Sequence, residues 1–193
     1  PPKDCLDTCM TAPLLAADEP SPVTVLREDG QSAIVLTADH AGRLIPRSLR
    51  QLGVPDHEME RHIAWDIGIE GVTRRLSALL DATAVLQTYS RLVIDCNRRP
   101  ESPGLCPPTS DGIDVPANQG LAAEERQRRL DLLHRPYHDA VEAWIGRAQP
   151  EASGGALYLM DPLGNLMLRW PADAHPGKVR KDLSRLLWAS RIG

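Results

Sequence analysis

The chain has 193 residues, of which 42% are hydrophobic and 25% are charged, and this is the composition of an ordinary globular protein. Its formal net charge of −4 gives no electrostatic reason to expect nucleic acid as a partner. No run approaches the roughly 18 apolar residues of a membrane span, and no signal peptide is evident, so we expect a cytoplasmic protein without a membrane partner.

Four short apolar runs predict strands, after a lead-in at residues 1–21 whose prolines and scattered acids predict poor order. The predicted strands span residues 23–26, 33–37, 83–87 and 91–96. The second and the fourth run each end in polar residues. Ligand sites in open α/β sheets gather at the C-terminal ends of strands, so these two ends are the places to look for a site.

Two helical patterns separate and follow these runs. In residues 56–80 the apolar positions recur at helical spacing, at Ile67, Val72, Leu76, Leu79 and Leu80. Residues 99–118 contain five prolines and predict a long loop. Residues 121–147 predict a strong helix with one apolar face, formed by Leu130, Leu133, Tyr137, Val141 and Trp144. Pro136 should kink or split that helix.

The sequence changes character after Pro150. Residues 151–155 resemble a linker, residues 156–170 predict a hairpin, and residues 176–189 predict a basic amphipathic helix. The expected organisation is therefore the lead-in at 1–21, one main domain at 22–150 and a hairpin-helix tail at 151–193.

Polar clusters at the strand ends carry the residue types of a metal-dependent enzyme. Asp39 and His40 follow one strand, Asn97 and Arg98 follow another, and Asp66 lies near the start of the first helical pattern. An imidazole and a carboxylate are ordinary zinc ligands, and a guanidinium binds a substrate carboxylate bidentately. Each residue also has a plainer interpretation, as a polar loop residue, an acid at a helix start, or a capped turn with a surface cation.

Three strings give a more specific indication: TADHAG at 37–42, HIAWDIG at 62–68 and YSRLVIDCNR at 89–98. Asn118 and the string RPYH at 135–138 follow in the same order. Over residues 13–149 the chain resembles the N-formylglutamate amidohydrolase family in these motifs.

The resemblance implies an α/β fold related to the zinc carboxypeptidases and aspartoacylases, with a mixed sheet flanked by helices. It also implies one zinc ion and hydrolysis of the amide of N-formyl-L-glutamate, or of a similar small N-acyl amino acid, to formate and glutamate. Carried over by motif, His40 and Asp66 would be the metal ligands, and Arg91, Asn97 and Arg98 would bind the substrate.

Roles for the other histidines rest on weaker grounds. His62 is either a hydrogen-bonding residue behind the ligands or a structural residue of the helix. Tyr137 and His138 are expected to pack and cap, with pocket lining as the alternative, and His57 and His134 are expected to face solvent.

The family pattern breaks after residue 149. The family continues with a His-Ser-Phe motif that supplies a third metal ligand, and later with an acidic general base, whereas this chain contains no Phe. We therefore expect a C-terminally truncated fold, weakly held zinc and impaired hydrolysis, and the sequence identifies no catalytic base.

The tail indicates an alternative function. Residues 156–193 resemble the C-terminal end of Sco-like thioredoxin-fold proteins, a family that uses a C-x3-C pair for copper or redox work. Cys5 and Cys9 have this spacing, although four cysteines are too few for a disulfide scaffold. The alternative is a non-catalytic copper-binding or thiol redox module, and a fused or frameshifted reading frame would account for two unrelated parts.

Overall fold

The computed structural model describes residues 13–32, 34–148, 156–160 and 166–171, together with residues 175, 177, 178, 181 and 182. The chain divides into two compact units, residues 1–145 and 146–193, and each is described by itself. Within the described ranges no helix is long and apolar enough to cross a membrane.

A three-stranded mixed sheet forms the centre of the first unit. Its order is β1 (Val23–Leu26), β3 (Thr83–Gln87), β2 (Val35–Ala38), with β1 antiparallel and β2 parallel to β3. Every residue of β3 is buried, because this strand has a neighbour on each side and a helix over each face. The strands predicted at 23–26 and 83–87 are confirmed, and the one predicted at 33–37 is observed as β2.

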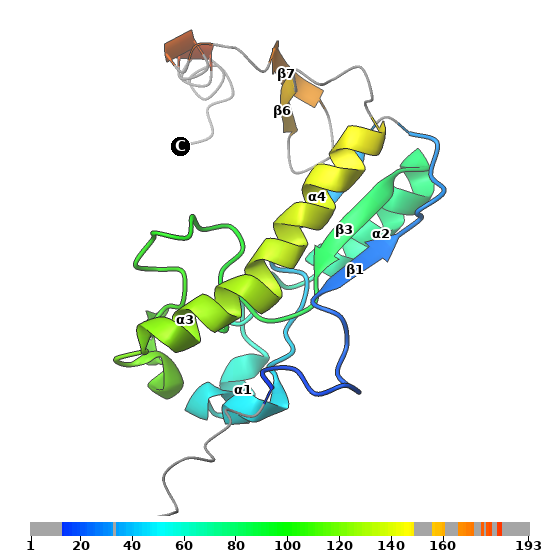
Figure 1. Ribbon diagram of the computed structural model, residues 1–193. Coiled ribbons are helices and arrows are strands. Elements are labelled where there is room, and N and C mark those ends of the chain that lie inside the picture. Colours follow the sequence, from blue (N-terminus) through cyan, green and yellow to red (C-terminus); the bar gives the residue numbers. More distant parts are fainter. Residues whose placement is uncertain are drawn as a thin grey trace, which may run out of the picture. The chain divides into compact units, whose positions relative to one another are not determined.

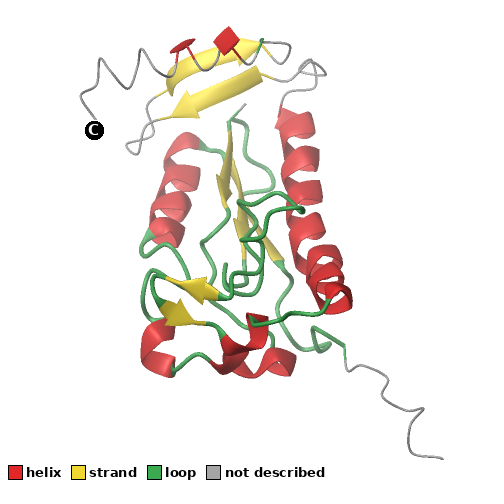
Figure 2. Cartoon of the chain, turned by 90° about the vertical axis from the view of Figure 1, so that its left-hand side faces the viewer, coloured by secondary structure: helices red, strands yellow, loops and turns green. Residues whose placement is uncertain are grey.

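Helices α2 (Ile69–Leu80) and α4 (Arg135–Ala148) lie on opposite faces of this sheet, as Figures 1 and 2 show. Side chains alternate between the faces along a strand, so neighbouring residues of β3 contact different helices. Ala84 and Leu86 belong to a cluster with Ile69 of α2, whereas Val85 packs in a cluster with Tyr137 of α4. The hydrophobic pattern of β3 thus fixes both helix layers.

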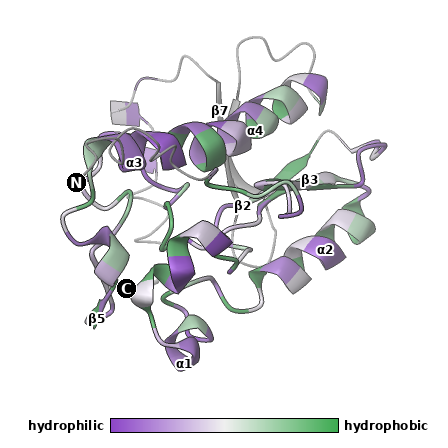
Figure 3. Ribbon diagram, turned by 60° about the horizontal axis from the view of Figure 1, so that its bottom comes forward, coloured by the Kyte–Doolittle hydropathy of each residue, from purple (hydrophilic) through white to green (hydrophobic). Residues whose placement is uncertain are grey.

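The helical pattern predicted at 56–80 is two helices rather than one. A short helix α1 (Asp56–Met59) is followed by turns, and α2 begins only after Gly68, whose φ of 88° is left-handed. On α2 the buried positions are Thr73 and Ser77, while the apolar residues that carried the pattern lie largely exposed. Small side chains against the sheet let the helix approach it closely, and Figure 3 shows hydrophilic and hydrophobic residues interspersed along α2.

The helix predicted at 121–147 is one continuous rod with a widened turn. It consists of α3 (Ala123–Arg129), a π-helical turn η3 (Leu130–His134) and α4. The amide of Arg135 bonds the carbonyl of Leu130, five residues back. Pro136 has no N–H to donate to a preceding carbonyl, so the ladder must change at this point. The helix therefore neither ends nor splits at the proline.

A second core lies under the loop-rich half of the unit, where Figure 2 draws mostly green loops. The elements here are short: the 3-10 helices η1 (Arg47–Gly53) and η2 (Pro116–Asn118) and the strand pair β4 (Thr109–Ser110) and β5 (Ile113–Asp114). The core contains buried residues from loops and helices, including Leu14, Leu52, Ile63, Tyr89, Leu105, Val115 and Leu133. Because Leu14 is fully buried, residues 13–21 pack against this core and do not form the poorly ordered lead-in that we expected.

The strand predicted at residues 91–96 is wrong, because this segment forms a chain of turns. The amide of Val93 bonds the carbonyl of Ser90, and the Ser90 hydroxyl accepts the amide of Leu92 while donating to the carbonyl of Ala64. Leu92, Val93 and Ile94 are all buried. A short apolar run that is buried on every side has the same sequence pattern as a buried strand.

The second unit contains the predicted hairpin, in which β6 (Ala156–Met160) pairs antiparallel with β7 (Leu166–Pro171). Most of the helix predicted at 176–189 lies outside the described residues. Cys5 and Cys9 also lie outside them, so the copper or redox alternative stays a prediction.

The segment after β2 requires a glycine at position 42. A Cβ added to Gly42 would lie 1.9 Å from the carbonyl oxygen of Thr88. The atoms that the added Cβ would meet are backbone atoms of residues 87 and 88, which cannot rotate away. Gly42→Ala therefore forces the chain after His40 away from the end of β3, and we expect it to destabilise the fold by about 1–3 kcal/mol or more. Urea unfolding measures this change.

Gly71, within α2, is the matched control, since a Cβ there meets nothing within 4 Å. Gly71→Ala should stabilise the helix by about 1 kcal/mol, because alanine is the better helix former. Equal stabilities of the two variants would contradict the close approach at Gly42.

Candidate active site

The candidate site lies where β2 and β3 end. The two strands are parallel, so their C-terminal ends are at the same edge of the sheet. Asp39 and His40 follow β2 directly, and the amide of Asp66 donates to the carbonyl of His40 at 3.0 Å. This backbone bond fixes Asp66 beside His40, although 26 positions separate them in the sequence.

The imidazole of His40 lies between two carboxylates. Its Nε2 is 2.7 Å from Oδ1 of Asp95, and its Nδ1 is 3.3 Å from Oδ2 of Asp66. The side chains of His40 and Asp95 are 7% and 5% exposed, whereas that of Asp66 is 51% exposed. The Asp95 side of the ring is therefore closed, and the Asp66 side is open to solvent.

Arg91 joins the two carboxylates from outside. Its Nη1 is 3.2 Å from Asp66 and its Nη2 is 3.3 Å from Asp95. His40, Asp66, Arg91 and Asp95 thus form a closed ring of four contacts, in which two acids alternate with two bases. The use of Arg91 in substrate binding stays a prediction, since both acids already engage its guanidinium in this structure.

Burial and pairing act against each other on the His40–Asp95 pair. Burial alone would lower the pKa of His40, but the hydrogen bond and negative charge of Asp95 outweigh it, and the pKa is raised above 6.5. Burial would raise the pKa of Asp95, but the hydrogen bond and charge of His40 hold it below its ordinary value. The pair therefore favours a protonated imidazole beside an ionised carboxylate.

Asn97 and Arg98, predicted to bind substrate, follow Asp95 in an exposed turn. Oδ1 of Asp95 accepts the amide of Asn97 at 2.9 Å, and Oδ2 lies 3.7 Å from Nε of Arg98. Asn97 and Arg98, with Arg99, Glu101 and Ser102, line a hollow of about 450 Å³. His40 and Asp66 are not among its lining residues, so Asp95 is what connects the two sets of predicted site residues.

A second hollow, of about 330 Å³, is lined in part by residues that lie close in sequence to His40 and Asp66. They include Ala41, Arg43 and Trp65, and the Arg43 guanidinium lies 5.2 Å from the centre of the Trp65 ring. Nε1 of Trp65 is buried and has no hydrogen-bond partner among the described residues.

The donor atoms of His40 and Asp66 fit one zinc ion. Two ligands of a tetrahedral zinc ion, each about 2.0–2.1 Å from the metal, lie about 3.3–3.4 Å apart. The 3.3 Å between Nδ1 of His40 and Oδ2 of Asp66 matches this separation. Asp95 binds the opposite ring nitrogen, as the orienting carboxylate of a histidine ligand does. Within the described part of the chain, no three His, Cys, Asp or Glu side chains are grouped to hold a metal.

Asp95 lies within the strand predicted at 91–96, and no role was predicted for it. The signal was present in the string DCNR at 95–98, where the acid precedes the Asn-Arg pair. A second polar contact was not foreseen: the hydroxyl of Tyr137, on α4, donates to Oδ1 of Asp39. Burial and the charge of Asp39 raise the pKa of Tyr137, so this hydroxyl stays a donor.

Among the histidines outside the cluster of His40, Asp66, Arg91 and Asp95, one differs from expectation. His57 is exposed as expected, and His62 is 64% exposed, 3.5 Å from Asp111. The prediction that His134 faces solvent is wrong, because its side chain is 5% exposed and its Nε2 lies 3.0 Å from the carbonyl oxygen of Arg98. The π turn rotates this position inward.

Comparison with known proteins places the chain in a family. A mixed sheet between helices, with polar side chains at its C-terminal edge, is typical of α/β enzymes. The sequence model of the N-formylglutamate amidohydrolase family matches residues 32–161, well over half of the chain. The chain therefore belongs to this family of hydrolases.

Two solved structures have a similar fold. A gene product of Agrobacterium tumefaciens is 37% identical with a TM-score of 0.69, over 72% of this chain and 55% of its own. The N-formylglutamate amidohydrolase from Ralstonia eutropha is 22% identical with a TM-score of 0.54, over 70% of this chain and 54% of its own, and shows the fold alone. The chain thus spans about half the length of either structure. No curated protein matches it.

Replacing Asp95 tests the electrostatics of the ring. Asp95→Asn removes the charge that raises the pKa of His40 and leaves burial to act alone, so the pKa of His40 should fall below 6.5. An NMR titration of the imidazole protons in the presence of chelator measures this change. Asp66→Asn, at the exposed acid, should lower the pKa less. A pKa of His40 that is unchanged in Asp95→Asn would contradict the pairing.

His134 should make stability depend on pH in the acid range. Burial lowers its pKa below 6.5, and the hydrogen bond to the Arg98 carbonyl offsets only part of this shift. The unfolded chain then takes up a proton at a higher pH than the folded chain. Stability is therefore lost as pH falls through 6.5 toward the folded pKa. The raised pKa of His40 acts in the opposite sense, losing stability as pH rises above 6.5.

A comparison with His134→Gln separates the two effects, since His40 is present in both proteins. Urea unfolding is measured at pH 7.5 and pH 5.5 in the presence of chelator. The free energy of unfolding should fall more between these two pH values in the wild type than in the variant. His57→Gln, at a position 77% exposed, should behave as the wild type. The same acid loss in His134→Gln would argue against the buried neutral imidazole.

Proposed function

We propose that the chain is a metal-dependent amidohydrolase that hydrolyses the amide of N-formyl-L-glutamate, or of a similar N-acyl amino acid. The observation that carries the proposal is the 3.3 Å separation of Nδ1 of His40 and Oδ2 of Asp66, with Asp95 on the other ring nitrogen. An imidazole with a carboxylate is a donor set that suits zinc. The family membership supports the reaction class, and the proposed fold is of the zinc carboxypeptidase and aspartoacylase type.

Each residue of the ring has a part in this proposal. His40 and Asp66 would hold the zinc ion, which when bound lowers the pKa of its water and polarises the carbonyl of the substrate. Asp95 keeps the proton of His40 on Nε2, so that Nδ1 faces Asp66. Arg91 holds both carboxylates in place through its two terminal nitrogens. The open side of Asp66 leaves access for water and substrate.

Asn97 and Arg98 would bind a carboxylate of the amino-acid part of the substrate. Arg98 is 58% exposed, its Nε is 3.7 Å from Asp95, and its side chain lines the same hollow as Asn97. A guanidinium and an adjacent amide recognise a carboxylate by geometry as well as by charge. This assignment gives the substrate class: a small acyl amino acid with a free carboxylate.

Zinc should be held weakly. A catalytic zinc site has about three protein ligands, and the described residues supply two. Zinc also has to displace the proton that the raised pKa of His40 favours, so its affinity should rise with pH. Hydrolysis should accordingly be slow compared with the Ralstonia eutropha enzyme.

The experiment combines zinc binding with formate release. Calorimetry on the 193-residue chain should give a weak zinc site that is lost in His40→Ala and weakened about 10- to 100-fold in Asp95→Asn, the usual effect of removing an orienting carboxylate. The zinc-loaded chain, incubated with N-formyl-L-glutamate, should release formate, and His40→Ala should not.

His57→Ala is the matched control, an exposed histidine outside the site that should leave zinc binding and hydrolysis unchanged. The Ralstonia eutropha enzyme serves as a positive control for the assay. Equal zinc affinity in the wild type and His40→Ala would contradict the metal site, and absence of formate would contradict the substrate.

A further inference from the structure

The turn that carries Asn97 and Arg98 is held from outside by one helix. The carbonyl oxygen of Cys96 lies 3.0 Å from Nε2 of His138, and that of Arg98 lies 3.0 Å from Nε2 of His134. These two carbonyls flank Asn97 on either side. Because the side chains of Asn97 and Arg98 are exposed, little packing orients them and their direction follows the backbone of the turn.

The same helix also holds the turn upstream. Nη1 of Arg129 donates to the carbonyl of Val93 at 3.1 Å and to Oδ1 of Asn118 at 2.7 Å. Nδ2 of Asn118 in turn donates to the carbonyl of Leu92 at 2.8 Å. Four carbonyls between residues 92 and 98 are therefore bound by side chains from η2 and the helical rod. Residues 91–98 do not pair with a neighbouring strand, so these side-chain hydrogen bonds take the place of the backbone hydrogen bonds that a strand would have.

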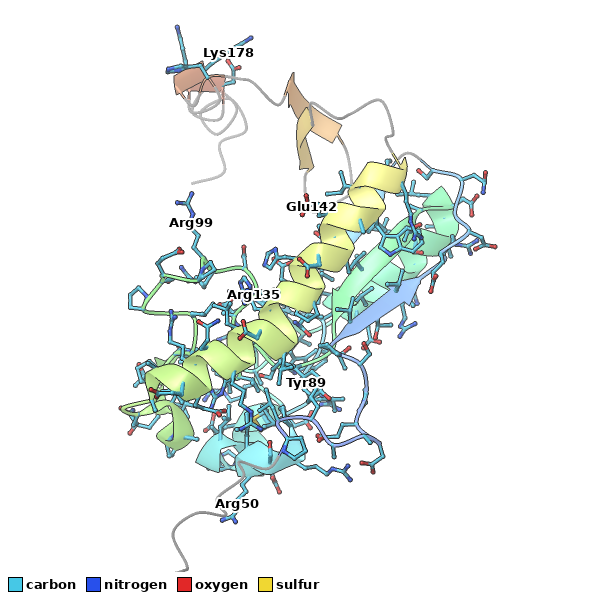
Figure 4. All side chains as sticks on the ribbon, viewed as in Figure 1. Arg50, Tyr89, Arg99, Arg135, Glu142 and Lys178 are labelled. Carbon is cyan, nitrogen blue, oxygen red and sulfur yellow. The ribbon has the colours of Figure 1, made fainter. Side chains whose placement is uncertain are left out.

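The π turn makes this arrangement possible. Arg129 and His134 are five residues apart, and in an α-helix such positions point about 140° away from each other. The i to i+5 spacing of the π turn brings them onto one side. His138 follows His134 at the α-helical spacing, and the two rings are in contact, with their centres 4.3 Å apart and their planes tilted by 37°. Figure 4 shows Arg135 on this rod, and this neighbour of His134 is exposed.

We propose that His134, supported by the neighbouring ring of His138, is a positioning residue that fixes the backbone of residues 96–98 and so orients Asn97 and Arg98 for binding a substrate carboxylate. The proposal rests on the proposed function for the role of Asn97 and Arg98. Both histidines face carbonyl oxygens with Nε2, so each carries its proton there, and neither contacts the reacting atoms.

The burial of His134 makes it the stronger of the two contacts. It is 5% exposed, so a carbonyl left without this donor loses a bond that water replaces poorly. Burial also lowers its pKa, so the ring is neutral at neutral pH, and the hydrogen bond to the Arg98 carbonyl favours the tautomer with the proton on Nε2. His138 is exposed, so its contribution should be smaller.

Two amide substitutions separate positioning from simple packing. His134→Gln places an N–H donor near the position of Nε2, whereas His134→Asn is one carbon shorter and falls short of the Arg98 carbonyl. Binding of N-acetyl-L-glutamate to the 193-residue chain should weaken roughly 3- to 10-fold in His134→Asn, the effect of losing one hydrogen bond, and stay near wild type in His134→Gln. Zinc affinity should be the same in both variants.

A second measurement reports the turn directly. Amide relaxation by NMR should show residues 97 and 98 more mobile in His134→Asn than in His134→Gln or wild type. The exposed pair His138→Asn and His138→Gln should show the same order with a smaller effect, and supplies folded variants if His134→Asn unfolds. Unchanged mobility in both Asn variants would overturn the positioning role, whatever the substrate is.

Arg98→Ala distinguishes the two proposals. If it weakens binding of N-acetyl-L-glutamate while His134→Asn does not, the carboxylate site stands and the positioning role is overturned. If Arg98→Ala leaves affinity unchanged, the carboxylate site fails, and the orientation of Arg98 by His134 has no bearing on binding. Weakened binding in Arg98→Ala and His134→Asn, with recovery in His134→Gln, supports both.

Discussion

The candidate site depends on one buried carboxylate. Asp95 contacts an imidazole, an arginine and a backbone amide at once, and it stands between the end of β2 and the turn of Asn97 and Arg98. A carboxylate that is 5% exposed is tolerated only when its charge is compensated, so the loss of any one partner places a greater demand on the others. The positions of His40 and Arg91 therefore follow from the need to neutralise Asp95, and Asp66 is drawn in through both of them.

Most of the sheet could be predicted from the sequence because its signals are local. β1 and β3 are short β-branched or apolar runs bounded by turn residues, and they lie where the runs lie. The segment at 91–96 has the same signal but a different structure, because Ser90 closes a turn with its side chain and the apolar residues enter a second core. Both segments are buried, so only the tertiary packing around each of them separates the two cases. The exposure of Val72 and Leu79 on α2 likewise depends on what the helix packs against.

The site was predictable in part for the same reason. The strings around His40 and Asp66 indicated that these residues belong together, and the structure brings their donor atoms to 3.3 Å. The role of Asp95 was missed because residues 91 and 95 of a strand would lie about 13 Å apart. In the turn, Arg91 and Asp95 form an ion pair at 3.3 Å instead. The wrong secondary structure thus concealed the central contact, and the π turn, which has no simple sequence signal, concealed the inward position of His134.

The pairing of the sheet has a kinetic consequence. Each partner pair joins residues 48 to 64 positions apart, as Thr37 with Val85 and Val23 with Gln87 show. No hairpin within this sheet can form early and guide the rest, so a large loss of chain entropy precedes any gain from pairing. His40 follows β2 and Asp95 follows β3, so the site is complete only when these two strands have paired. A ligand bound there recognises the assembled sheet alone, and should therefore retard unfolding far more than it hastens folding.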